Sequence, residues 1–518
     1  MMSWLQSVSL IQDNFFTLGF FVVVLIILRG FLRYREDIQQ FLEDRGKLVK
    51  FAATLPGPKT LPLIGNALAI RDTEKAILTL SKMSRDMNGE TFRFWLGPFL
   101  KIVVPNPRDI QIIISSSKAA HKDDVYKLME PGVVGGLINA NGDYSMTKFL
   151  AHKKLIQPML NGGLVMDRFA KLFNFKSRGL VKRLEEKVDT GEFDVIEFIT
   201  SFIGDITLET LVGRPAILEN GEVMPFLTET QTALHATIYR MARPWLYPYS
   251  LFCITKKGRE YSEIIKRAHE FIDDNVSQAV DNYKPAKTED IINMPLLHFL
   301  VDHMMKTQEL TPVEIRYELI TVFIAIFETL EGISCLLILM IAMHPEAQRK
   351  IRKEILQVMR NETINEPETK RLNYLDLVIR ETIRLFPVGP VLPRKTTDEI
   401  KLSTCTLPKN CSVMMLPFAV HRDPKYWSEP DKFIPERFTP ENSKDRHPYA
   451  YIPFSGGPRS CLGPRYALMV LRIMVAHLLR SYELTTSMKI DNLQLITHIS
   501  TRSLNGHKIS VKKIELSN

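Results

Sequence analysis

The chain has 518 residues, 45% of them hydrophobic and 24% charged, a composition ordinary for a globular protein. Its net charge of +9 suits an anionic membrane surface or an acidic protein partner; we expect no nucleic acid among its partners, since Lys and Arg never run beyond two in a row and no nucleic-acid-binding motif is present. The five scattered cysteines form neither a disulfide framework nor a zinc-type spacing, which favours a reducing, cytosol-facing environment.

The first predicted element is an apolar N-terminal segment. Residues 4–28 carry one charge, Asp13, and basic residues follow, including Arg29 and Arg35. A helix of this length can span a bilayer, and the basic flank places the following chain in the cytosol. The small-residue cleavage site of a secretory signal is absent from the sequence here. We therefore predict an uncleaved single-pass signal-anchor over residues 1–35, in the endoplasmic reticulum membrane.

Prolines separate this segment from the rest of the chain. Residues 55–58 read Leu-Pro-Gly-Pro, which is a stiff, helix-breaking sequence. We predict a linker and proline-rich hinge over residues 36–58. One domain is expected over residues 59–518, because no Gly/Ser linker, low-complexity tract or internal repeat interrupts them. Near its start, the apolar stretches 91–94 and 101–104 predict a short hairpin.

A long helix is predicted over residues 311–343. Thr311 stands at the N-cap, Pro312 at the first position and Glu314 three residues after the cap, which together make a capping box. The apolar pattern continues to the His-Pro pair after the last residue. A second membrane span is the alternative, but two glutamates near the middle would be costly in a bilayer. The pattern therefore favours a buried helix that crosses the domain.

Two short patterns contain acids. Glu328 precedes Thr329 in the middle of the long helix, and an acid beside an alcohol suits directional proton delivery. Glu381 and Arg384 lie three residues apart, on one face of a predicted helix. Taken alone, the first pattern is common on helices and the second is usually a weak surface pair.

A glycine-rich loop with one cysteine precedes the last long helical stretch. Residues 449–463 read YAYIPFSGGPRSCLG, and an apolar stretch over 466–479 predicts a helix. Glycines let the backbone turn tightly and bring N–H groups toward the sulfur. These donors and the positive end of the helix favour the thiolate of Cys461, which suits it as the proximal ligand of haem iron. The alternative is a buried structural cysteine, the commonest fate of a free cysteine.

Five positions of this loop match the pattern F-x-x-G-x-R-x-C-x-G, and with them the chain resembles the haem-thiolate monooxygenases, the cytochromes P-450 of eukaryotic microsomal type. The resemblance runs from about residue 56 to 514. Residues 241–275 are diffusely similar to the branch that includes fatty-acid omega-hydroxylases. The resemblance implies a mostly α fold with a small β-rich lobe, preceded by one N-terminal transmembrane helix.

The resemblance also implies haem b, iron protoporphyrin IX, as the cofactor. Ala325 stands where related omega-hydroxylases often carry a glutamate that esterifies the haem, so we expect non-covalent haem. Cys461 is the expected metal ligand, and Thr329 and Glu328 the expected catalytic pair, with Thr329 hydrogen-bonding dioxygen and Glu328 relaying protons. The other residues expected to bind the cofactor are Arg459, Phe454, Gly457, Arg394, Lys153 and Phe149.

Several positions depart from the family pattern. Phe149 replaces a tryptophan and cannot donate a hydrogen bond to a haem propionate, while Lys153 replaces an arginine but keeps a positive charge. Ile326 replaces a glycine and Leu330 a second hydroxyl residue on the long helix, and either change narrows the distal groove or slows proton delivery.

The Glu381–Arg384 pair resembles the family's Glu-x-x-Arg helix. Because an arginine fork can bridge a carboxylate and carbonyls together, we predict that Glu381, Arg384 and Arg437 form a structural lock behind the haem.

The implied function is monooxygenation of a lipophilic substrate: a fatty acid, a steroid-like hormone or a xenobiotic. One oxygen atom of dioxygen would enter the substrate, with electrons from NADPH delivered by a cytochrome reductase at a basic surface formed by Lys153, Lys154, Arg446 and Arg465. Two alternatives remain. One is a reductase-independent haem-thiolate isomerase or dehydratase, which Ile326 and Leu330 favour and the Glu-Thr pair disfavours. The other is a non-catalytic haem-binding membrane protein.

Overall fold

The computed structural model describes residues 35–73, 75–133, 136–140, 143–217, 223–287, 290–497 and 499–514. The predicted membrane segment lies outside these residues, apart from its last position, Arg35. The chain divides into two compact units, Met1–Leu55 and Pro56–Asn518. The described part of the first unit is helix α2 (Arg35–Ala53), which occupies most of the predicted linker, and its following residues.

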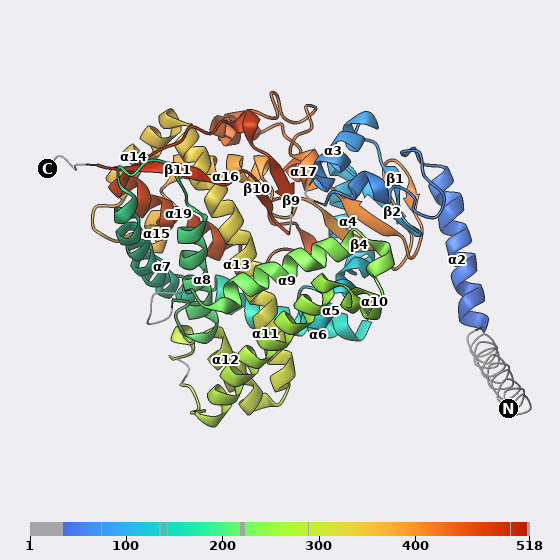
Figure 1. The fold of residues 1–518 in the computed structure, drawn as a ribbon, viewed down its shortest axis with the longest axis horizontal. Coiled ribbons are helices and arrows are strands. Elements are labelled where there is room, and N and C mark those ends of the chain that lie inside the picture. The colour runs from blue at the N-terminus through green and yellow to red at the C-terminus, as the bar shows by residue number, and fades with distance from the viewer. Residues whose placement is uncertain are drawn as a thin grey trace, which may run out of the picture. The chain divides into compact units, whose positions relative to one another are not determined.

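The second unit is mostly helical, as the sequence predicts (Figure 1). Its principal helices are α3 (Ala76–Asp86), α4 (Pro107–Ser115), α6 (Asp143–Asn161), α7 (Gly163–Leu184), α8 (Ile196–Val212), α9 (Pro225–Met241), α11 (Lys256–Asp281), α12 (Leu296–Thr307), α13 (Pro312–Met343), α14 (Pro345–Val358), α16 (Asn373–Leu385) and α19 (Pro464–Ser481). Shorter helices are α5 (Glu130–Val133), α10 (Tyr249–Ile254), α15 (Glu366–Thr369), α17 (Pro417–Val420) and α18 (Pro440–Ser443).

The strands form small sheets. The largest has the order β1-β2-β7-β4. Its antiparallel pair β1 (Phe92–Leu96) and β2 (Phe99–Val104) is the predicted hairpin, and β2 runs parallel to β7 (Ser412–Met415). The other strands are β3 (Phe193–Asp194), β4 (Leu392–Lys395), β5 (Ile400–Lys401), β6 (Thr406–Leu407), β8 (Tyr482–Thr485), β9 (Leu495–Thr497), β10 (Thr501–Ser503) and β11 (Lys508–Lys513).

Helix α13 crosses the second unit between the other helices (Figure 1). The predicted capping box is present: the Thr311 side chain accepts from the Glu314 N–H, and the Glu314 carboxylate accepts from the Thr311 N–H. Among the described residues, α13 alone has the length and apolarity to cross a bilayer, and 89% of its most apolar window is buried inside the protein. A helix that is apolar on all sides is either buried in a protein core or spans a membrane, and the burial of α13 indicates the core. The prediction of a buried core helix is therefore confirmed.

Candidate active site

An apolar cavity of about 350 Å³ lies between α13 and the loop that carries Cys461. One wall is formed by α13, through residues such as Ala325 and Thr329. The opposite wall is the loop from Ile452 to Gly463 and the start of α19. All five cysteines lie in the described part of the chain, and Cys461 is the one that lines this cavity. The sequence therefore brings its one candidate thiolate and its one candidate Thr hydroxyl to opposite sides of the same space.

The loop wraps its backbone around the Cys461 sulfur. The Cys461 N–H donates to the Phe454 carbonyl at 3.0 Å, and the Gly463 N–H donates to Cys461 Sγ at 3.3 Å. Burial raises the pKa of the Cys461 thiol. The Gly463 N–H, the Lys153 ammonium and the Leu462 N–H act in the opposite direction, since each stabilises the thiolate. The predicted tight turn and the predicted N–H donor to the sulfur are both present. The Gly463 N–H favours ionisation of the Cys461 thiol, which burial disfavours.

Gly457 is the position of this loop that tolerates no side chain. Its φ is +62°, and an added Cβ would lie 2.1 Å from the Ile114 carbonyl oxygen at the end of α4. We expect Gly457→Ala to lower the free energy of unfolding by about 2 kcal/mol or more, from the left-handed backbone and the clash together. Chemical denaturation followed by the haem absorbance would measure it.

Gly463→Ala is the matched control. Gly463 has a φ of −119°, and the nearest atom to an added Cβ is 4.0 Å away. The Gly463 N–H that reaches the sulfur would also remain. Equal destabilisation by the two alanines would contradict this account of the loop.

Three cationic side chains line the cavity: Lys122, Arg394 and Arg459. They lie close enough that burial and the charges of Arg394 and Arg459 together lower the pKa of Lys122 well below its usual value. Arg459 is 8% exposed; it donates to the carbonyls of Ala120 and Ala140 at 2.9 and 2.5 Å, while its Nη1 has no hydrogen-bond partner among the described residues. Like charges held together this way make the cavity a favourable place for an anion.

On the wall formed by α13, the two predicted catalytic residues lie apart. Thr329 lines the cavity, and its hydroxyl donates to the Ala325 carbonyl of its own helix at 2.5 Å. Glu328 is fully buried and does not line the cavity. Its carboxylate accepts from Arg502 Nη2 at 2.7 Å and from the Ser500 hydroxyl at 3.2 Å. The structure therefore places Thr329 at the cavity and ties Glu328 to the segment that includes β10.

Comparison with known proteins supplies the deciding observation. The family model described as cytochrome P450 matches residues 55–505. The chain belongs to the cytochrome P450 family. It is 28% identical over 474 residues to cytochrome P450 4V2 of Rattus norvegicus, covering 88% of this chain and 89% of the relative. Two Drosophila melanogaster proteins are also similar: probable cytochrome P450 4aa1, at 27% identity with 95% of each chain covered, and probable cytochrome P450 313a4, at 29% with 89% and 94% covered.

Membership of the P450 family makes the protein a monooxygenase that binds haem b non-covalently through a cysteine thiolate. The residues around the cavity fit that cofactor. Cys461 offers the thiolate, and the cluster of Lys122, Arg394 and Arg459 offers positive charge for the two propionates. Arg459 Nη1, which has no hydrogen-bond partner in the part of the chain that the structure describes, could donate to one of them. Lys122 was missed in the sequence, where an isolated lysine carries no pattern.

Of two other residues predicted to contact the haem, Phe149 lines the cavity and Lys153 does not. Phe149 lines the cavity, and the Arg459 guanidinium lies over its ring, 3.7 Å from the centroid. Phe149 therefore supports the arginine, although it cannot donate a hydrogen bond. Lys153 does not line the cavity: its ammonium donates to the Pro458 carbonyl at 2.8 Å and to the Ser460 hydroxyl at 3.4 Å. It holds the Cys461 loop from outside.

The predicted lock is present in this P450. Arg384 donates twice to Glu381, at 2.7 and 2.9 Å, and once each to the carbonyls of His421 and Pro430. Arg437 Nε donates to the same carboxylate at 3.3 Å. Glu381 and Arg384 are fully buried. The lock joins α16 to the segment that precedes the Cys461 loop.

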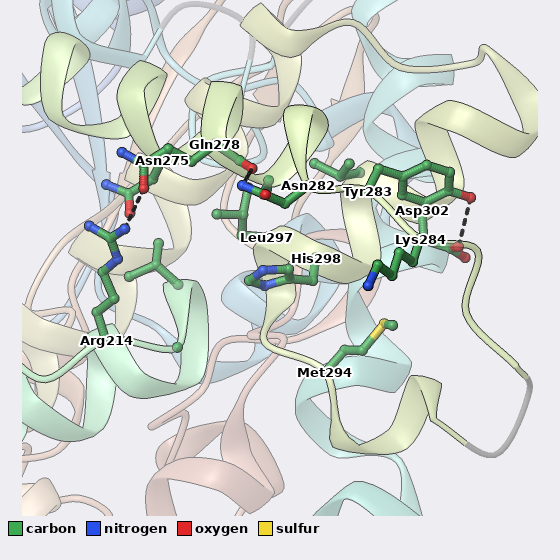
Figure 2. A pocket seen from close by; sticks show the side chains of 14 residues that line it. Arg214, Asn275, Gln278, Asn282, Tyr283, Lys284, Met294, Leu297, His298 and Asp302 are labelled. Carbon is green, nitrogen blue, oxygen red and sulfur yellow. Dashed lines mark hydrogen bonds between the residues drawn. The ribbon is translucent and has the colours of Figure 1, made fainter.

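A larger cavity, of about 430 Å³, lies between the ends of α8 and α11 and helix α12 (Figure 2). Figure 2 shows Arg214 beside Gln278 at one side and Tyr283 with Asp302 at the other. None of its described lining residues also lines the haem cavity, and no cysteine is among them. Asp302 is already bound by Tyr283 and by Lys306, at 3.1 and 2.8 Å. Size alone therefore does not locate the reaction in this P450.

Proposed function

We propose that this P450 uses Cys461 as the thiolate ligand of haem iron and inserts one oxygen atom from dioxygen into a lipophilic substrate. The electrons come from NADPH through a flavoprotein reductase. The observation that carries this proposal is the placement of Cys461 and Thr329 across one apolar cavity whose described lining contains no second cysteine. The apolar lining favours a fatty acid, a steroid-like hormone or a xenobiotic over a polar substrate.

Bound haem supplies the activation of dioxygen, and the chain supplies the surroundings of the reaction. Cys461 would hold the haem iron through its thiolate, whose charge the Gly463 N–H would stabilise. Lys122, Arg394 and Arg459 would hold the propionates. Across the cavity from Cys461, the Thr329 hydroxyl would position dioxygen and supply it with a proton. Ile326 and Leu330 are buried and line the same wall, where they limit the water that reaches it.

Thr329→Ala is expected to lower the rate of product formation roughly 10- to 100-fold, the loss of one hydrogen bond to a charged group. Release of hydrogen peroxide should rise, because the reduced dioxygen is no longer protonated at the position that leads to product. Product and hydrogen peroxide are measured together against NADPH consumed. Thr329→Ser keeps the hydroxyl and serves as the control. An unchanged ratio of product to peroxide in Thr329→Ala would contradict the role.

Membrane attachment is supported by an apolar patch on the second unit. Exposed large apolar side chains gather on segments that lie next to one another. Gly97 lies between two of these segments: an added Cβ there would be 3.3 Å from Pro244 and 3.9 Å from the Leu63 carbonyl oxygen. The patch comprises Leu61, Leu63, Leu68, Phe99, Trp245, Leu251 and Ile254. Leu63 is 94% exposed and Ile254 is 70% exposed. Together with the predicted anchor over residues 1–35, the patch favours a protein held on the endoplasmic reticulum membrane, with its catalytic domain in the cytosol.

The reductase is expected to dock beside the Cys461 loop. Lys154 and Arg465 are exposed there, and Lys153 is partly exposed. Arg446 is partly buried: it donates to the Arg437 carbonyl at 2.7 Å, so it contributes less to this surface than the sequence predicts. A basic face of this kind attracts an acidic partner and speeds association at low salt.

The decisive experiment is turnover of a panel of lipophilic substrates with purified reductase, NADPH and dioxygen. Product formation that requires all three supports the proposal. Rearrangement of an oxygenated lipid without reductase would show the isomerase or dehydratase instead. Absence of any turnover, in a sample whose ferrous–carbon monoxide spectrum shows a thiolate-bound haem, would indicate a non-catalytic haem protein.

A further inference from the structure

A second buried glutamate shares the arginine that holds Glu328. The same atom, Arg502 Nη2, lies 2.7 Å from Glu328 Oε2 and 2.5 Å from Glu331 Oε2. Both glutamates are fully buried, and Arg502 is 7% exposed. Glu331 has its own supports: the Thr200 hydroxyl donates to its Oε1, and Gln231 Nε2 donates to that oxygen at 2.6 Å. One guanidinium therefore pairs with two carboxylates in the interior of the protein.

The groups packed around this triad do not supply the missing positive charge. Burial and the charge of Arg502 lower the pKa of His235, on α9, to about 4, so its imidazole is neutral. Burial also lowers the pKa of His507 to about 4, although Asp194 opposes the shift. The thiol of Cys335 on α13 is neutral, because burial raises its pKa well above the usual value. Asp194, which interacts with both Cys335 and His507, is a further acid.

Two buried acids and one base leave one negative charge uncompensated, and such a charge is normally removed by a proton. Burial raises the pKa of Glu328. The charge of Glu331 raises it too, while the charge of Arg502 lowers it. Glu328 is also the acid adjacent to Thr329 in the chain. Its carboxyl faces away from the cavity, so it must leave Arg502 in order to deliver a proton.

We infer that Glu331 is a positioning residue that keeps Arg502 paired while Glu328 takes up a proton and turns toward Thr329. This inference rests on the proposed function. In the resting arrangement the two acids share Arg502, and Glu328 carries the proton. When Glu328 leaves as the neutral acid, Arg502 and Glu331 remain as a balanced pair, so no buried charge is stranded. Without Glu331, the departure of Glu328 would leave Arg502 buried and alone.

The proton balance follows from monooxygenation. A substrate C–H, dioxygen, two electrons from the reductase and two protons give the hydroxylated product and one water. Glu328 gives one of the two protons and returns as the carboxylate to Arg502. It then regains a proton from solvent. The cycle consumes no group of the protein.

The test is Glu331→Gln, in the full-length protein with haem bound. Glutamine keeps an acceptor for Thr200 and removes the charge, so Arg502 pairs with Glu328 alone and holds it as the carboxylate. We expect the ratio of product to peroxide to fall about tenfold, less than the loss of a complete general acid because Glu328 remains. Infrared difference spectroscopy over a pH titration should show a protonated-carboxyl band in the wild type that Glu331→Gln loses. Glu331→Asp should restore part of both signals.

Glu346→Gln, a substitution at an exposed glutamate on α14, is the control and should change neither signal. If Glu331→Gln keeps both the wild-type ratio and the infrared band, the inference is wrong. If Glu331→Gln does not fold, the band in the wild type and its partial loss in Glu331→Asp still decide, because an absent band in the wild type means that Glu328 carries no proton. A wild type that shows the band but forms no product would contradict the proposed function and leave the protonated Glu328 standing.

Discussion

Cys461→His is expected to lower turnover by a factor on the order of 10³ or more, because imidazole does not donate electron density as a thiolate does. The wild-type protein, reduced and exposed to carbon monoxide, should show the red-shifted Soret band of thiolate-bound haem. The variant should show the band at the imidazole-type position or bind no haem. The cavity wall around Cys461 has no other described cysteine to replace the lost ligand.

Cys405→Ser is the matched control for this substitution. Cys405 is partly buried and does not line the haem cavity. Its removal should leave the spectrum and the rate unchanged. A thiolate-type band that persists in Cys461→His would mean that another residue binds the iron and would overturn the assignment.

Glu381→Ala is expected to lower the free energy of unfolding by about 3–5 kcal/mol, the usual result of removing one partner from a buried charge network. The substitution leaves Arg384 fully buried without its carboxylate and removes the ion pair of Arg437. It also removes the acceptor of the Ile434 N–H, at 2.8 Å. The lock holds the segment that precedes the Cys461 loop in the sequence. Its loss should therefore loosen the loop, so haem should dissociate at a lower denaturant concentration than in the wild type.

Denaturation followed by circular dichroism and by haem absorbance, in parallel, would measure both effects. Glu346→Ala is the control, because Glu346 pairs with Arg349 on the surface, where such pairs contribute little. Equal effects of the two substitutions would show that the lock contributes nothing beyond a surface ion pair.

Much of the site could be predicted because its signals are contiguous in the sequence. The Cys461 loop carries its glycines and arginine within fifteen residues and is followed directly by α19, and the start of α13 carries its whole capping box within four residues. Such short-range patterns fix local geometry before any tertiary contact forms. The lock was predicted from the family pattern for Glu381, Arg384 and Arg437, since the spacing of Glu381 and Arg384 alone indicates only a weak surface pair.

Helix geometry accounts for the orientation of Glu328 once the cavity-facing side of α13 is known. Neighbours on an α-helix point about 100° apart, so the cavity-facing side of α13 holds Thr329 and Leu330 but not Glu328, on the other flank of Thr329. Ala325 and Thr329 are four residues apart and share one face, while Glu328 and Glu331 are three apart and share another. The partner of the two acids could not be predicted, because Arg502 is 174 residues from Glu328 and no local pattern joins them. Lys122 was hidden for the same reason.

The long separation between Glu328 and Arg502 has a consequence for biosynthesis. Helix α13 leaves the ribosome with two acids on one face, and their counter-charge is synthesised 174 residues later. At 5–20 residues per second this delay is roughly 10–35 s. Throughout that interval Arg502 is missing, so burying α13 would require both carboxylates to be protonated or to stay unpaired, which makes early burial of this helix unfavourable. A segment near the end of the chain thus completes the charge balance of the central helix.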